Sequence, residues 1–435
     1  AHGRAGRLAE LLRTAPDSDV RRIRPLALAR AWNVPATAAI ELCLQATRLG
    51  LLELRWDLLC PRCRIAKATS PGLDRLPIGA HCGTCNIDYG RDFSRNVELS
   101  FRPAEAIREI EPGEFCLLGP MSMPHVWAHV TLAPGEARGL DAAPPPGPYR
   151  LRTLEAGPEV EIAHEGGPFP SVVVTDDGVT AGPAGAAGAV ILRNASAHRR
   201  TVVIESRAWV KDALTADRVA TLQAFRDLFS DEVLRPGDEV AIRRVALIFS
   251  DLRGSTALYG AIGDAAAYHL VREHFAYLGG IVREHDGCIV KTIGDAVMAA
   301  FADPALAVKA AIAMQERVAE LNRAELDREA PAPLVLTLGV HAGPCIAVTM
   351  NDRLDYFGST VNLAARLQDQ SKGGDLVISA DLAAEPEIAP LLAGRALTRE
   401  SAQLRGIATP VAFVRLRFDG AVAELPASPR ATVPG

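Results

Sequence analysis

The stretch Val245-Ala-Leu-Ile-Phe-Ser-Asp251-Leu-Arg-Gly-Ser-Thr256 decides the fold of the C-terminal half of the chain. Its aliphatic run ending at Asp251 is typical of a buried β-strand, and Gly254, Ser255 and Thr256 predict a turn that opens a helix. The acid would lie at the carboxyl end of the strand, where open α/β sheets bind ligands. Free amides at a helix start favour an anion, so the stretch predicts a site for a metal ion and a phosphate. A buried strand with a plain capping turn is the alternative.

The chain has 435 residues and a formal net charge of -5. This length predicts about two to four domains. The charge balance lacks the basic excess of proteins whose main partner is nucleic acid. No apolar run reaches the roughly 18 residues needed to cross a bilayer, and the N-terminus lacks the apolar core of a signal peptide. We therefore expect a cytoplasmic protein without membrane contact.

Four of the eight cysteines form two CxxC pairs, Cys60-Pro-Arg-Cys63 and Cys82-Gly-Thr-Cys85. Two such pairs can supply four thiolates to one tetrahedral metal ion, which leaves no position for substrate or water. The spacing therefore predicts one structural Zn²⁺. Two disulfides are the alternative, and a reducing cytoplasm disfavours them.

The N-terminal region divides by composition into three parts. Residues 5–57 predict three short helices and a strand, similar to a winged helix-turn-helix. The third helix, 36–49, carries only Glu41 and Arg48 as charged residues. Such a helix lacks the side chains that contact phosphates and base edges, so a docking or regulatory module is favoured over DNA binding. Residues 58–95 are expected to form a zinc ribbon around the two CxxC pairs.

Residues 96–211 alternate short β-prone runs with Pro- and Gly-rich turns, which predicts an antiparallel β-sandwich. The region 212–236 is expected to be a linker whose residues 214–229 form one amphipathic helix. The expected strands of the sandwich are 114–118, 125–132, 149–154, 159–163, 171–175, 189–193 and 201–205.

Residues 237–420 alternate strands and long helices, which predicts an α+β domain close to a ferredoxin-like core. Gly294-Asp295 is expected at the corner of a hairpin over 288–301. A second hairpin is expected to turn at Gly343, between 334–342 and 344–350. The tail 421–435, rich in Pro and Ala, is predicted to be disordered. The remaining expected elements are helices 264–285, 304–326 and 359–370 and strands 354–357, 376–379 and 410–418.

Two acids of this domain, Asp251 and Asp295, are predicted to lie on neighbouring strands. Adjacent carboxylates repel unless a cation lies between them, and two carboxylates with a backbone carbonyl suit Mg²⁺. Farther along, Asn362 and Arg366 share one helix face, where an amide and a guanidinium suit a ribose and a phosphate. The alternatives are a simple turn residue at 295 and a solvated helix face.

With these motifs in place, residues 245–418 resemble the catalytic domain of class III nucleotidyl cyclases. The matching segments are Phe249–Thr256, Lys291–Asp295 and Asp355–Arg366. The resemblance implies that Asp251, Asp295 and the Leu252 carbonyl hold two Mg²⁺ or Mn²⁺ ions. The helix start at Gly254, Ser255 and Thr256 is expected to bind the phosphates of the substrate. The resemblance also implies that Lys291 and Asp355 read the purine, Asn362 orients the ribose and Arg366 neutralises charge at the α-phosphate.

One position departs from that family's pattern. The family usually has a Lys before the Gly of a late strand motif, where it holds the terminal phosphates. This chain has Arg405 before Gly406, which keeps the charge but changes the geometry.

The purine pair favours ATP, because Asp355 can accept from the adenine amino group and Lys291 can donate to adenine N1. Guanine offers a carbonyl and an N–H at those positions, a mismatch worth about a hundredfold or more in discrimination. The resemblance further implies a head-to-tail homodimer that makes cyclic AMP and pyrophosphate. A guanylate cyclase, a nucleotide sensor without turnover and a zinc-ribbon transcription factor are the alternatives. The ligand or protein that acts on the N-terminal region is not specified by any motif.

Overall fold

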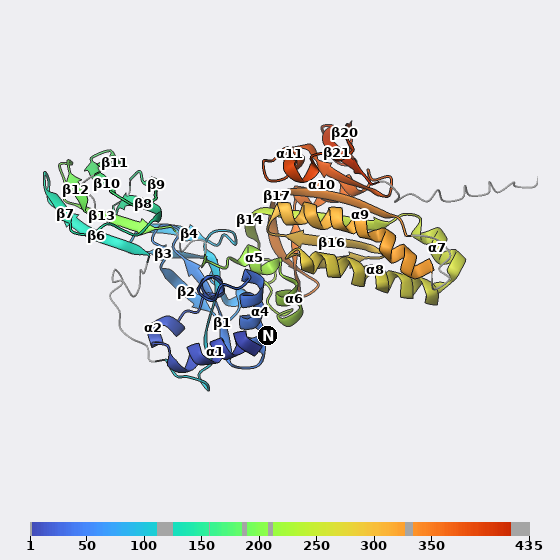
Figure 1. Cartoon of the computed structure of the whole chain (residues 1–435), viewed down its shortest axis with the longest axis horizontal. Coiled ribbons are helices and arrows are strands. Elements are labelled where there is room, and N and C mark those ends of the chain that lie inside the picture. Colours follow the sequence, from blue (N-terminus) through green and yellow to red (C-terminus); the bar gives the residue numbers. More distant parts are fainter. Residues whose placement is uncertain are drawn as a thin grey trace, which may run out of the picture. The chain divides into compact units, whose positions relative to one another are not determined.

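The computed structural model describes residues 2–110, 125–155, 157–184, 189–207, 212–326 and 334–418. The chain divides into two compact units, unit 1 over 1–216 and unit 2 over 217–435, whose elements are labelled in Figure 1. The expected strand 114–118 and the tail 421–435 lie outside the described residues. Among the described helices, none has the length and apolar character to cross a membrane.

Unit 1 begins with four helices packed against a three-stranded sheet of order β2-β1-β5. Asn33 takes a left-handed conformation (φ 51°) that ends the third helix, and Pro35 precedes the fourth. Trp56, on the central strand, is fully buried in the core. The elements are α1 His2–Thr14, α2 Asp17–Val20, α3 Pro25–Trp32, α4 Ala36–Arg48, β1 Leu52–Leu59, β2 Ala66–Ser70, η1 Leu73–Arg75 and β5 Val97–Pro103.

Strand β5 corrects the expected start of the sandwich at residue 96. Its residues pair with β1 in antiparallel register, from Val97 opposite Leu58 to Pro103 opposite Leu52. Ile23 also forms a bridge with Phe101. Leu99 and Phe101 are thereby buried beneath the helices, and this long-range pairing decides which sheet the strand joins.

A β-sandwich of two four-stranded sheets follows, with orders β6-β13-β8-β9 and β11-β10-β12-β7. Alternate residues of both sheets, among them Leu151, Val174 and Val202, pack into one core. The expectation of a wholly antiparallel sandwich is wrong in one place, because β10 and β12 pair in parallel, with Val172 opposite Leu192. The strands are β6 Val126–Leu132, β7 Ala137–Leu140, β8 Gly147–Thr153, β9 Val160–His164, β10 Pro170–Thr175, β11 Gly178–Ala184, β12 Val190–Asn194 and β13 Arg200–Ser206.

The segment between the sandwich and the last domain is not the single helix expected over 214–229. It forms two short helices, α5 Ala216–Ala220 and α6 Gln223–Leu228. The carbonyl oxygen of Ala220 accepts hydrogen bonds from Arg226 Nε and Cys288 Sγ instead of continuing a helix. Side-chain contacts therefore override a pattern that is helical by periodicity alone.

Unit 2 is built on a large mixed sheet of order β15-β16-β14-β17-β19-β21-β20, with β18 paired to β17. Helices α8 and α9 pack their apolar faces with α11 and α12 into one core against the sheet. Helix α10 packs against β17 and β14. The elements are β14 Val240–Leu252, α7 Ser255–Ile262, α8 Asp264–Glu284, β15 Cys288–Ile293, β16 Ala296–Phe301, α9 Pro304–Leu326, β17 Leu336–Met350, β18 Arg353–Phe357, α10 Ser359–Gln368, β19 Asp375–Ser379, α11 Ala380–Ala383, α12 Ala389–Leu392, β20 Leu397–Ala402 and β21 Val411–Arg417.

The first expected hairpin of unit 2 is confirmed, since β15 and β16 pair around Gly294-Asp295. The second is wrong, because β17 runs unbroken through Gly343 and turns at Asn351-Asp352 before β18. Gly343 serves another purpose: a Cβ there would lie 2.7 Å from Thr360 Oγ1. Its missing side chain lets α10 lie directly on the strand, a close approach that local sequence does not distinguish from a turn.

Candidate active site

The two acids expected to bind metal lie side by side at one end of the sheet. Strand β14 pairs with β16 up to Ser250 opposite Val297. Asp251 follows Ser250, and Asp295 lies at the hairpin corner two residues before Val297. The antiparallel register thus carries the two carboxylates to neighbouring positions, from segments 44 residues apart.

Electrostatics at this pair favour a bound cation. Burial and the nearby charge of Asp295 raise the pKa of Asp251 to about 6, and a hydrogen bond from the Leu252 amide only partly opposes the rise. Asp295 Oδ2 is buried without a hydrogen-bond partner. A pair of carboxylates that repel one another, with one oxygen left unsatisfied, is a donor set that fits a hard divalent cation.

Two residues that sequence reasoning missed stand next to the acids. Burial raises the pKa of Tyr259, on α7, to about 12, and Asp295 adds to that rise. His274, on α8, is fully buried, and burial lowers its pKa to about 4. Neither residue belongs to a motif, so only the packing of α7 and α8 could have placed them here.

The turn after β14 supplies the predicted helix start. Gly254 takes a left-handed conformation (φ 76°) and caps α7, which begins at Ser255. The side chain of Thr256 lies outside the described side chains. The amide of Leu252 donates to Asp251, and the backbone oxygen of Asp251 accepts from Thr337 Oγ1 at 3.1 Å. These bonds hold the strand end while leaving the amides at the start of α7 available to an anion.

The predicted purine pair forms an ion pair in this structure. Lys291 Nζ donates to Asp355 Oδ2 at 2.7 Å. The Lys291 side chain is 35% exposed and that of Asp355 is 9% exposed. The amide of Tyr356 donates to the other carboxylate oxygen at 2.8 Å. The pair therefore joins β15 to β18 and presents one donor and one acceptor at a partly open edge.

Helix α6 supports this pair, a feature the sequence does not signal. Arg226 Nη1 donates to the carbonyl of Leu354, next to Asp355, and its guanidinium lies over the ring of Tyr356 at 5.7 Å. Gln223 Oε1 accepts from the amide of Ile289, two residues before Lys291. Segment 217–229 thus contacts both strands that carry the purine pair.

Asn362 and Arg366 do not join the clusters above. Asn362 is exposed on α10, and Arg366 makes an ion pair with Asp369 at 2.9 Å. No hydrogen bond or ion pair between described residues links either of them to the two acids or to the Lys291–Asp355 pair. Arg405 is exposed in the turn between β20 and β21. Arg366 is nevertheless linked to the first acid through Asp369, whose charge adds to the raised pKa of Asp251.

The four cysteines of the CxxC pairs come together in unit 1. Their sulfur atoms all lie within 4.8 Å of one another, and all four residues are buried. Cys60 and Cys63 follow β1, while Cys82 and Cys85 flank the turn between β3 Gly79–Cys82 and β4 Ile87–Gly90. The spacing of the sulfurs fits a tetrahedral thiolate site.

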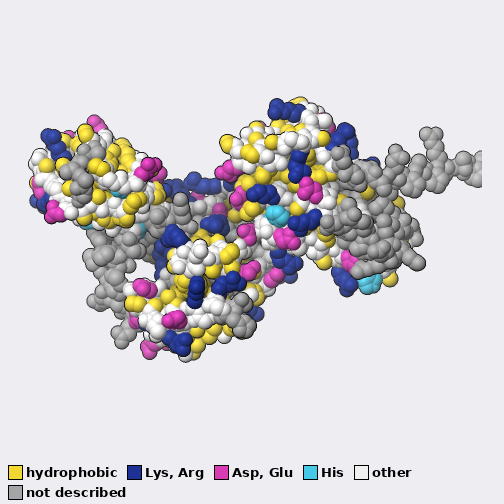
Figure 2. Space-filling model, viewed as in Figure 1, with side chains coloured by type: hydrophobic (Ala, Val, Ile, Leu, Met, Phe, Trp, Pro, Cys, Tyr) yellow, Lys and Arg dark blue, Asp and Glu magenta, His cyan; other side chains and the backbone are white. Residues whose placement is uncertain are grey.

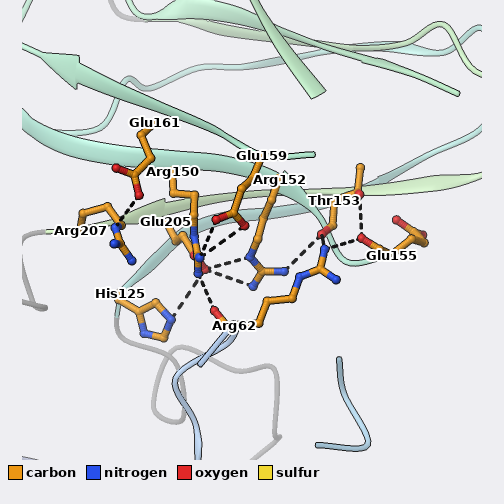
Figure 3. A network of polar contacts seen from close by, with 10 residues as sticks. All are labelled: Arg62, His125, Arg150, Arg152, Thr153, Glu155, Glu159, Glu161, Glu205 and Arg207. Carbon is orange, nitrogen blue, oxygen red and sulfur yellow. Dashed lines mark hydrogen bonds and ion pairs between the residues drawn. The ribbon is translucent and has the colours of Figure 1, made fainter. Parts of the chain in front are cut away.

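A network of ion pairs and hydrogen bonds joins residues of the sandwich to Arg62, as Figure 3 shows. Glu205 on β13 accepts from Arg150 and Arg152 on β8, the latter at 3.1 Å. Arg150 also donates to the carbonyl of Arg62, between Cys60 and Cys63, and Arg62 donates to the carbonyl of Thr153 at 3.2 Å. The network ties the cysteine loop to the sandwich.

Two parts of the chain match known protein families. Residues 239–386 match the family described as "Adenylate and Guanylate cyclase catalytic domain". Residues 3–120 match a family of unknown function, DUF5939.

Individual relatives match over the C-terminal region only. An adenylate cyclase of Anabaena cylindrica is 31% identical over 139 residues, 30% of this chain and 28% of that protein. An uncharacterized protein of Mycobacterium tuberculosis is 32% identical over 175 residues, 40% of this chain and 42% of that protein. The chain therefore spans less than half the length of these relatives.

The solved structure of the adenylyl cyclase CyaB from P. aeruginosa is 24% identical with a TM-score of 0.38, covering 43% of this chain and all of that one. The family match rests on the sequence of residues 239–386, which contains both acids, the purine pair and the Asn362–Arg366 helix face. Residues 239–386 of this chain belong to the adenylate and guanylate cyclase catalytic domain family.

Proposed function

We propose that the chain is an adenylate cyclase that converts ATP to 3′,5′-cyclic AMP and pyrophosphate. The observation that carries the proposal is the pair of carboxylates Asp251 and Asp295. Burial and the charge of Asp295 raise the pKa of Asp251, and Asp295 Oδ2 is buried without a partner. The nearby Lys291–Asp355 pair supplies purine recognition on the same domain.

The two carboxylates and the Leu252 carbonyl would hold two Mg²⁺ or Mn²⁺ ions. When bound, such ions activate an attacking hydroxyl and stabilise charge on the phosphate. The chain's own residues perform the rest. Amides at the start of α7, from Gly254 and Ser255 onward, face the phosphates, and Asp251 must lose its proton before it can act as a ligand.

Asp355 and Lys291 select the base. To read adenine, Asp355 accepts from the exocyclic amine and Lys291 donates to N1, so each gives up part of its bond to the other. Guanine would place a carbonyl acceptor opposite the carboxylate acceptor of Asp355 and an N–H donor opposite the ammonium donor of Lys291, so neither hydrogen bond could form. We expect kcat/KM to be about a hundredfold or more higher for ATP than for GTP. Equal rates, or a higher rate with GTP, would favour the alternative, a guanylate cyclase.

Asn362 and Arg366 are proposed to complete the site of a partner subunit. Asn362 is exposed on α10, and no hydrogen bond or ion pair among the described residues joins it or Arg366 to Asp251 or Asp295 of the same chain. In a two-fold homodimer, each site would combine acids and purine pair from one subunit with Asn362 and Arg366 from the other. Arg405 is proposed to contact the terminal phosphates.

Mixing two inactive variants tests this arrangement. Asp295→Ala and Arg366→Ala should each abolish turnover alone. In an equal mixture, half of the dimers would be mixed, and each would contain one intact site of two, so activity should return to about a quarter of the wild-type value per chain. No recovery in a mixture shown to exchange subunits would place all groups of the site on one chain. Binding of ATP without turnover in the wild-type protein would favour a nucleotide sensor.

The four cysteines are proposed to hold one structural Zn²⁺. The support is the close approach of four buried sulfurs, which fits four thiolate ligands and leaves no site for substrate. Elemental analysis of the purified full chain should give one zinc per chain, and Cys63→Ser should lower it. A metal-free protein without free thiols at these positions would indicate disulfides instead. Unit 1 is proposed to regulate unit 2, which a turnover comparison of the full chain with residues 217–435 would measure.

A further inference from the structure

Unit 1 contains a hollow of about 840 Å³ that the proposed cyclase chemistry does not use. It lies between α1, α4 and the segments around residues 51 and 107. Its volume falls within the range of about 300–1,000 Å³ that small-molecule sites occupy. In Figure 2 the surface of the helical part of unit 1 carries hydrophobic, basic and acidic side chains together.

The walls of the hollow are two apolar helix stripes. Leu8 and Leu12 lie one turn apart on α1, and Leu42 and Ala46 lie one turn apart on α4. Ala9 also lines the space, and its small side chain leaves room between the helices. A lining of this kind offers dispersion contacts to a linear chain and few hydrogen bonds.

Large apolar side chains remain exposed at the edge of the hollow. Leu49 is 76% exposed, Ile107 is 46% exposed and Leu51 is 37% exposed. Single exposed apolar residues are ordinary, but a group of them around one concave space marks a binding site.

The charged residues of the lining are both arginines. Arg108 is engaged, because it donates to the carbonyls of Leu12 and Ala15 and forms an ion pair with Asp17. Arg13 donates through Nε to the carbonyl of Ala9, and no other contact of Arg13 is recorded among the described residues. Among the described residues that line the hollow, none is Asp or Glu. A ligand that fits this lining would therefore have one anionic group near Arg13 and an apolar body.

We propose that this hollow binds a linear fatty carboxylate, with its acyl chain between α1 and α4 and its carboxylate against Arg13. A phosphate-rich ligand would need several available donors, and the described lining offers the terminal nitrogens of Arg13 and the side chain of Gln45. The site belongs to unit 1, so its occupancy is measured independently of cyclase turnover.

Isothermal titration of the full chain with octanoate, decanoate, dodecanoate and tetradecanoate, each below its micelle concentration, tests the proposal. Each added methylene that is buried should lower Kd about fourfold until the hollow is filled. Dodecanoate should bind about fivefold or more tightly than 1-dodecanol. Binding of neither compound, or a Kd independent of chain length, would overturn the proposal.

Two pairs of variants locate the site. Ala9→Trp fills the hollow and should weaken dodecanoate binding at least tenfold, whereas Glu10→Trp, on an exposed position of the same helix, should leave Kd unchanged. Arg13→Gln should remove the preference for dodecanoate over 1-dodecanol, whereas Arg48→Gln, outside the lining, should keep it. Circular dichroism checks that each variant is folded.

Two results would refute the location. One is unchanged binding by Ala9→Trp. The other is a chain that binds no carboxylate but self-associates through this face, detected as a wild-type oligomer that Ala9→Trp dissociates in sedimentation.

Discussion

Replacing Asp295 by Asn should stabilise the metal-free protein while it abolishes catalysis. The carboxylate of Asp295 is one cause of the raised pKa of Asp251, and its Oδ2 has no hydrogen-bond partner. Asn has nearly the same shape but no charge, so it removes the repulsion and keeps the packing. The same change removes one of the two carboxylates proposed to hold metal. Stability and activity should therefore move in opposite directions.

The expected increase in the free energy of unfolding follows from the pKa of Asp251. A rise from 3.8 to about 6 would correspond to about 3 kcal/mol at pH 7 for a fully buried group. Asp251 is only half-buried, and burial contributes more to the rise than Asp295 does. Solvent screening reduces this figure, and the part caused by burial of Asp251 is still present in the variant. Removing the charge of Asp295 should therefore raise the free energy of unfolding by about 1 kcal/mol.

The stabilisation by Asp295→Asn depends on pH. Below about pH 4, Asp251 is protonated in the folded and unfolded states, so charge repulsion between Asp251 and Asp295 does not destabilise the folded protein. Between pH 4 and 6 the unfolded chain releases the proton while the folded chain retains it, so the wild type loses stability as pH rises. The stabilisation by Asp295→Asn should therefore be near zero at pH 4 and reach about 1 kcal/mol at pH 7.

Hydrogen exchange of peptides from β14 and β16, in the presence of a chelator, measures this free energy locally. It is preferred to tryptophan fluorescence because all four tryptophans lie in the first 216 residues. Asp352→Asn, an exposed acid in the turn after β17, is the matched control and should change neither exchange nor turnover. Faster exchange in Asp295→Asn at pH 7, or an equal gain at pH 4 and pH 7, would refute the reasoning.

Three further changes have expected outcomes. Gly343→Ala should destabilise unit 2 by about 2 kcal/mol in thermal unfolding, because the new Cβ would lie 2.7 Å from Thr360 Oγ1. The control Gly260→Ala, which has open space around it, should leave stability unchanged or raise it. Unchanged stability of Gly343→Ala would contradict the close approach of α10 to β17. Asp355→Asn should lower kcat/KM for ATP about tenfold or more and reduce the ratio of kcat/KM for ATP to kcat/KM for GTP. If parallel assays with the two nucleotides gave the wild-type ratio, Asp355 would have no part in base selection. Arg226→Met removes the hydrogen bond to Leu354 and should speed hydrogen exchange of β18 by an amount equivalent to about 1–3 kcal/mol; unchanged exchange would mean that segment 217–229 does not support that strand.

Local patterns in the sequence were sufficient to locate the chemical groups of the proposed site. A buried strand ending at Asp251, a Gly-Asp hairpin corner at Asp295 and a helix face with Asn362 and Arg366 each depend on residues a few positions apart. The CxxC pairs depend on equally short spacings. Because strand alternation, turn chemistry and helix periodicity act over such distances, these features follow from the chain alone.

The tertiary structure decided which of these groups meet and what else touches them. The antiparallel register carried Asp251 to Asp295, and the ion pair to Asp355 joined Lys291 to a strand sixty-four residues away. Contacts of Arg226 broke a segment that is helical by periodicity. Gly343, which reads as a turn, serves close packing of α10. Each outcome depends on burial and contact between residues far apart in sequence, and the free energy of those contacts exceeds the local preferences that the sequence pattern expresses.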